Sequence, residues 1–211
     1  MRLYVWEPEN AAFLIHECPP EAQMPYVDHL RFSVYDYVRG GKTDLCWADR
    51  RGLSALDGLY RRSGVPFRVD CGFRRPVGPG TDPLSPHCAG LAFDVGKDLP
   101  PPEREALRSA ALNGGWFHRV QMPYESGLSL HLALCPFPTR LGSRDAGPAV
   151  LALQDLLLRC RLYRGALTGT YCNETRRAVL RLQRKADLPE TGRMEGRCWQ
   201  ALRRIDKPTS G

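Results

Sequence analysis

Residues 85 to 94 read Ser-Pro-His-Cys-Ala-Gly-Leu-Ala-Phe-Asp and place two potential metal ligands, His87 and Asp94, on either side of a glycine. Gly90 and its small neighbours allow the backbone to turn tightly between the two ligands. The apolar residues that alternate after Gly90 predict a strand, which would present Asp94 on a fixed surface.

A third ligand is offered by His131, in the run Leu-Ser-Leu-His-Leu-Ala-Leu at residues 128–134. This run also alternates with a period of two, so it predicts a second strand. Two histidines and one carboxylate form the incomplete shell that leaves zinc a position for water, as catalytic zinc sites do. The sequence therefore predicts a hydrolytic zinc centre.

The stretch at 85–94 resembles the Ser-x-His-x-x-Gly-x-Ala-x-Asp signature of the zinc D-alanyl-D-alanine carboxypeptidase and L-alanyl-D-glutamate endopeptidase family, which cuts peptidoglycan stem peptides. Residues 67–76 resemble the family's strand followed by Ser-Gly-Tyr-Arg-Ser-Pro, with Cys71 in place of the serine and Phe73 in place of the tyrosine. The resemblance implies that Arg74 lies beside the zinc and stabilises the anionic transition state.

The chain departs from this family at the general base. Many members carry an acid three positions before the last zinc histidine, where this chain has Leu128, and others carry an aspartate where it has Ala133. Glu125 is the nearest acid upstream and is our candidate for the base, in a turn-like segment that could bend towards the metal. These departures leave open a catalytically weakened relative.

Two further residues are candidates for substrate contacts. Ser85 could hydrogen-bond a ligand or cap the local turn, and Tyr124 could touch substrate or fill space. The other histidines have no ligand partners at suggestive spacing and are interpreted as ordinary surface or core residues: His16, His29 and His118.

Length and composition indicate a globular protein. With 211 residues, 43% of them hydrophobic, the chain can bury a proper core. It has no apolar run long enough to cross a membrane and no recognisable secretory signal, so we expect synthesis in the cytoplasm and no membrane association. The eight cysteines are dispersed, which favours free, buried thiols. Cys71 and Cys88 flank the predicted site, where a disulfide or a thiolate ligand is the alternative.

The organisation predicted is α+β: a zinc peptidase domain over 1–138 with a small antiparallel sheet and flanking helices, a linker over 139–146, and an all-α module over 147–206. The linker belongs to a stretch rich in proline and glycine. Within the first domain the patterns predict the following helices and strands: helices over 49–62 and 101–112, and strands over 67–71 and 116–122.

The module shows three short apolar stripes at helical spacing. Its sequence resembles the three-helix peptidoglycan-binding domain in the pattern Val-x-x-Leu-Gln, Thr-Gly-x-Tyr, Thr-x-x-Ala-Val-x-x-Leu-Gln and Thr-Gly. The residues that match are Val150, Leu153, Gln154, Thr168, Gly169, Tyr171, Thr175, Ala178, Val179, Leu182, Gln183, Thr191 and Gly192. Most are core or turn positions, so they predict the fold more than a ligand.

Charge is concentrated in the same module. Residues 141–211 carry 14 basic and 7 acidic side chains, which equals the whole net charge of +7. This excess predicts an acidic partner such as the bacterial wall, and the alternative is a solvated, arginine-rich helix face. No basic stretch is interleaved with aromatics, so nucleic acid is not expected.

Together these patterns predict a monomeric, zinc-dependent peptidoglycan peptidase that acts at the cell wall, held there by its C-terminal module. The arrangement resembles phage endolysins, and a bacterial wall-remodelling enzyme is equally open. The rival hypothesis is a non-catalytic wall-binding protein that retains the metal for structure. The resemblance does not choose between carboxypeptidase and endopeptidase action.

Overall fold

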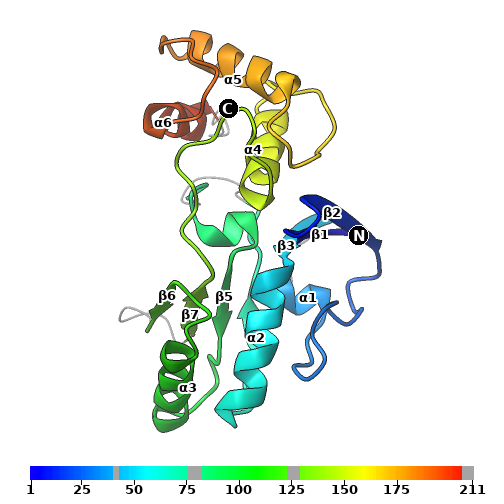
Figure 1. Ribbon diagram of the computed structural model, residues 1–211, viewed down its shortest axis with the longest axis vertical. Coiled ribbons are helices and arrows are strands. Elements are labelled where there is room, and N and C mark those ends of the chain that lie inside the picture. The colour runs from blue at the N-terminus through cyan, green and yellow to red at the C-terminus, as the bar shows by residue number, and fades with distance from the viewer. Residues whose placement is uncertain (40–42, 76–81, 123–128, 206–211) are drawn as a thin grey trace, which may run out of the picture.

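A computed structural model of the chain describes residues 1–39, 43–75, 82–122 and 129–205. The fold is α+β, with two small sheets in the N-terminal part and three helices grouped at the opposite end of the molecule (Figure 1). One continuous hydrophobic core cluster includes residues from both parts.

The first sheet has the order β2-β1-β3, from strands β1 (Arg2–Glu7), β2 (Ala12–Glu17) and β3 (Leu45–Asp49). β1 pairs antiparallel with β2 and parallel with β3. The sequence pattern does not predict this sheet, because every residue of β1 after Arg2 is buried. A strand covered on both faces lacks the alternation of apolar and polar residues that marks a half-buried strand.

The second sheet has the order β4-β5-β7-β6 and is the small antiparallel sheet that was predicted. Its strands are β4 (Val69–Cys71), β5 (Ala92–Val95), β6 (Arg119–Gln121) and β7 (Leu130–Ala133). The outer strands β4 and β6 are shorter than the predicted ranges of 67–71 and 116–122. Only the segments that face β5 or β7 pair with a neighbour.

Three helices accompany these sheets: α1 (Val34–Tyr37), α2 (Arg50–Ser63) and α3 (Pro101–Gly114). The predicted helices over 49–62 and 101–112 are therefore confirmed to within two residues. Asp49 begins α2 by accepting a hydrogen bond from the Arg51 backbone, and Gly64 ends it in the left-handed conformation. Helix α2 contacts β1 and β3 of the first sheet and also helix α3.

The C-terminal module consists of α4 (Pro148–Arg159), α5 (Asn173–Lys185) and α6 (Gly196–Ile205), as predicted. Two buried glutamines explain its repeated Leu-Gln and Thr-Gly motifs. The Gln154 side-chain oxygen accepts from the backbone of Thr168 and Gly169, and the Gln183 oxygen accepts from Gly192. Each glutamine thus holds one Thr-Gly turn against the helix that carries it. Among the described residues, no helix is both long and apolar enough to cross a membrane.

The module packs directly on the N-terminal part. Asp155 of α4, which is fully buried, pairs with Arg75, whose Nε lies 3.1 Å from the Asp155 carboxylate. Within the predicted linker, the backbone carbonyl of Thr139 accepts a hydrogen bond from the Trp199 indole at 2.9 Å. Helix α4 also contacts the short 3-10 helix η1 (Pro86–Ala89). The two parts therefore share a structured interface.

Candidate functional site

The second sheet aligns three chemically active side chains in one row. Asp94 on the central strand β5 lies directly opposite His131 of β7 on one side and Cys71 of β4 on the other. Directly paired residues of neighbouring strands point their side chains to the same face of a sheet. His87 joins this row from η1, the short helix immediately before β5.

Steric constraints explain why a glycine lies between the two ligands of the 85–94 stretch. Gly90 ends η1 at a φ of 63°, and a Cβ added there would lie 2.3 Å from the backbone carbonyl oxygen of Trp47. That carbonyl is itself fixed by a 2.9 Å hydrogen bond from the Tyr37 hydroxyl. Only glycine allows the chain to pass this point and place both His87 and Asp94 on the same site.

Three donor atoms from these residues converge within hydrogen-bonding distance. The His87 Nε2 atom lies 3.2 Å from Asp94 Oδ1 and 3.3 Å from His131 Nδ1, and His131 Nδ1 lies 2.9 Å from Asp94 Oδ1. A tetrahedral zinc shell with bonds of about 2.0–2.1 Å separates its ligand atoms by about 3.3 Å. The triangle of donors therefore fits one face of a zinc tetrahedron.

The orientation of His87 indicates that this triangle holds a positive charge. Its Nδ1 lies 3.1 Å from the carbonyl oxygen of Gly72, which can only accept a hydrogen bond, so the Nδ1 carries the proton. In the neutral ring, Nε2 then presents a lone pair towards the Asp94 carboxylate. Two acceptors at this distance need a proton or a metal ion between them.

Electrostatics agree with this interpretation. Burial lowers the pKa of His87, but hydrogen bonds to Asp94 and Cys71 and the charge of Asp94 raise it to about 9. Burial raises the pKa of Asp94, whereas hydrogen bonds from His131 and His87 and the charges of His87 and Arg74 hold it well below its usual value. The site thus stabilises a carboxylate beside a cation, and either a proton or a metal ion can supply that cation.

Arg74 contacts two members of the row. Its Nη2 donates to Asp94 Oδ2, and its Nε lies 3.3 Å from the Cys71 sulfur. The bond to Oδ2 leaves Oδ1 turned towards the two histidines. Arg74 therefore orients a predicted ligand, a contact that the sequence does not predict, and its exposed guanidinium retains Nη1 for another partner.

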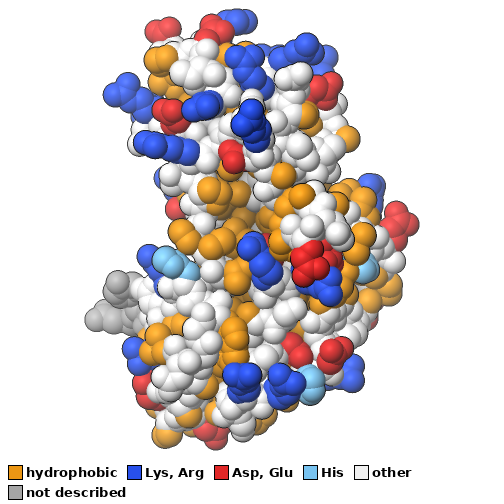
Figure 2. All heavy atoms as spheres, in the orientation of Figure 1, with side chains coloured by type: hydrophobic (Ala, Val, Ile, Leu, Met, Phe, Trp, Pro, Cys, Tyr) orange, Lys and Arg blue, Asp and Glu red, His pale blue; other side chains and the backbone are white. Residues whose placement is uncertain are grey.

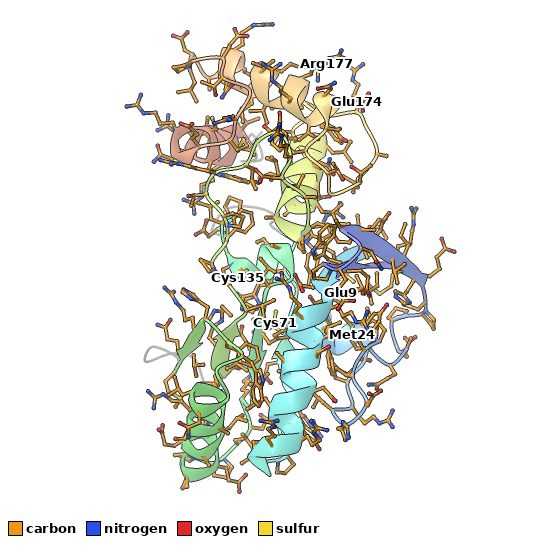
Figure 3. All side chains as sticks on the ribbon, in the orientation of Figure 1. Glu9, Met24, Cys71, Cys135, Glu174 and Arg177 are labelled. Atoms are coloured by element: carbon orange, nitrogen blue, oxygen red, sulfur yellow. The ribbon has the colours of Figure 1, made fainter. Side chains whose placement is uncertain are left out.

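Cys71, the alternative ligand that the sequence suggests, also belongs to this site. The ligand atoms of Cys71, His87 and Asp94 all lie within 4.8 Å of one another, and Cys71 is buried. Figure 3 labels it in the N-terminal part, near the strands of the second sheet. Its spacing from His87 and Asp94 resembles no metal-binding motif, and the site becomes visible only when β4 pairs with β5.

Of the residues predicted for proton transfer and substrate contact, only Ser85 is among those that the structure describes. Glu125 and Tyr124 lie outside the described residues, as does Leu128. Ser85 precedes η1, but its hydroxyl makes no capping hydrogen bond, so the capping interpretation is wrong. A different acid, Asp70 of β4, accepts hydrogen bonds from Ser129 Oγ and the Lys97 backbone, and burial raises its pKa.

The C-terminal module presents a second candidate surface. Lys and Arg side chains are numerous on the face of the module that Figure 2 shows. Helices α5 and α6 and the turn between them expose nine basic side chains, of which Arg203 pairs with Asp82 of the N-terminal part. Between the end of α5 and α6 lies an open pocket of about 370 Å³, which Lys185, Arg197 and Arg204 line together with apolar residues. Such a groove suits a ligand that carries carboxylates on an apolar body.

Comparison with known proteins identifies this module. Residues 146–202 match the family model of a putative peptidoglycan-binding domain. No curated protein matches the chain. No solved structure matches it either. The match covers α4, α5, most of α6 and the turns held by Gln154 and Gln183, and it supports association with the cell wall.

Proposed function

We propose that the protein is a zinc-dependent peptidase that cleaves peptidoglycan stem peptides next to D-amino acids. The observation that carries the proposal is the convergence of His87 Nε2, Asp94 Oδ1 and His131 Nδ1 at 2.9–3.3 Å, in a row built by η1 and two paired strands. Further support comes from the peptidoglycan-binding domain on the same chain.

Each residue has a role in this proposal. Bound zinc supplies a Lewis acid and lowers the pKa of a coordinated water to about 7. His87, Asp94 and His131 hold the ion, and the Gly72 carbonyl fixes the tautomer of His87. Arg74 orients Asp94 and is also proposed to stabilise the oxyanion of the substrate through its remaining donor. Glu125 is proposed as the general base.

The C-terminal module is proposed to hold the protein on its insoluble substrate. Its exposed basic residues are suited to the carboxylates and other anions of the wall. Because the module packs on η1 and pairs with Arg75, a bound wall polymer would be held at a fixed distance from the metal site. This arrangement raises the local concentration of stem peptides.

One observation favours a second function. The Cys71 sulfur lies within 4.8 Å of the ligand atoms of His87 and Asp94, and a fourth protein ligand is typical of structural zinc sites. In that case the protein would be a zinc-containing wall-binding protein without peptidase activity.

The two functions differ in one experiment. Purified protein is incubated with muropeptides before and after removal of metal by a chelator, and the products are identified by mass. The peptidase proposal requires new fragments that disappear with chelation and return when zinc is added. The absence of any fragment from zinc-loaded protein would contradict the peptidase and favour the wall-binding protein.

A further inference from the structure

Cys71 makes the metal site different from an open shell of two histidines and one carboxylate. It lies opposite Asp94 across the β4–β5 pair, so its side chain points to the same face as Asp94 and His131. Its sulfur lies within 4.8 Å of the ligand atoms of His87 and Asp94. The thiol is buried beside the position that the ion would take.

We infer that Cys71 is a fourth protein ligand, and that its thiolate competes with water for the remaining position on the zinc ion. This inference rests on the proposed zinc site and deepens it by specifying the state of the fourth position.

Arg74 fixes the position of the Cys71 sulfur. Its Nε atom lies 3.3 Å from that sulfur and can donate a hydrogen bond to it. The same guanidinium binds Asp94, so Arg74 holds two members of the row on the same side of the sheet. When the metal binds, the thiol proton is released to solvent, because only the thiolate is a metal ligand.

A sulfur ligand has two chemical consequences. Thiolate selects zinc over the hard cations Mg²⁺, Ca²⁺ and Mn²⁺, which prefer oxygen. With His87, Asp94 and His131, it would also fill the fourth position of a tetrahedral shell, where a catalytic zinc site binds water. The zinc would thus be held tightly in a resting state of low activity.

Zinc-edge X-ray absorption of the full chain tests this directly. We expect one sulfur at about 2.3 Å from zinc, together with nitrogen and oxygen ligands at about 2.0–2.1 Å. In Cys71→Ser we expect zinc to remain bound and the sulfur signal to be lost. The matched control is Cys88→Ser, because Cys88 is also buried beside the site but directs its sulfur to the Asp82 carbonyl. This control should keep the sulfur signal.

The outcomes separate this inference from the zinc site itself. Stoichiometric zinc with a shell of nitrogen and oxygen alone would overturn the role of Cys71 and leave the zinc site standing. A sulfur signal that persists in Cys71→Ser would also overturn it. Parent protein that binds no zinc would overturn both. The competition with water further requires zinc-loaded Cys71→Ser to hydrolyse muropeptides faster than the parent, and a slower rate would contradict it.

Discussion

Replacement of Gly90 by alanine tests the steric basis of the metal site. Gly90 has a φ of 63°, and a left-handed conformation costs an L-residue about 1–2 kcal/mol. The new Cβ would also lie 2.3 Å from the Trp47 carbonyl oxygen and 3.0 Å from the Cα of Ala48, both of them backbone atoms. Forcing such atoms apart costs about 1–3 kcal/mol. The total loss expected in the free energy of unfolding is about 2–5 kcal/mol.

The matched control is Gly64→Ala, at the end of α2. Gly64 has a φ of 65°, but a Cβ there would have nothing within 4 Å, so it carries the conformational strain without the collision. For a chain of this size, about 1 kcal/mol corresponds to about 2–4 °C in Tm. We expect Tm to fall by about 4–20 °C in Gly90→Ala and by only about 2–8 °C in Gly64→Ala.

Thermal unfolding followed by circular dichroism, with zinc content measured in parallel, distinguishes the two effects. Gly90→Ala should also lose zinc, because the displaced turn separates His87 from Asp94, whereas Gly64→Ala should retain it. Equal losses of Tm in the two variants would refute the collision with Trp47. Full zinc content in a destabilised Gly90→Ala would refute the link between this turn and the ligands.

Three further predictions concern other parts of the chain. Asp155→Asn leaves Arg75 without its buried partner and should cost about 3–5 kcal/mol of stability in thermal unfolding, whereas Glu190→Gln, in an exposed pair, should leave Tm unchanged. Glu125→Gln should keep zinc but lower muropeptide turnover by about two to four orders of magnitude. If Glu125→Gln keeps the parent turnover and Asp70→Asn loses this amount, Asp70 is the base. A fragment from residue 146 onward should sediment with peptidoglycan sacculi at low salt and dissociate as salt rises, and no retention at low salt would refute the anchoring role.

The sequence predicted those elements whose residues form a local pattern. Such patterns are the apolar stripes of α2, α4 and α5 and the period-two run around His131. They can be recognised without knowing which distant segments they contact. The first sheet was missed because β1 is buried on both faces and gains its partner β3 only from a segment about forty residues away. Pairing between distant strands leaves little local trace.

The residues of the site divide in the same way, into those that a local pattern identifies and those that only the fold brings together. His87, Asp94 and Gly90 lie in one short stretch, so their chemistry could be interpreted before the fold was known. Cys71 could not be assigned from its own neighbourhood, because only the antiparallel pairing of β4 with β5 places it opposite Asp94. Arg74 was expected beside the metal, but its bond to Asp94 depends on the same pairing.

The zinc site formed by His87, Asp94 and His131 is tested most directly by elemental analysis of purified protein. We expect close to one zinc per chain in the parent and almost none in His87→Ala. His118→Ala, which changes an exposed histidine outside the row, should keep the full zinc content. Zinc that is absent from the parent, or that remains complete in His87→Ala, would contradict the site.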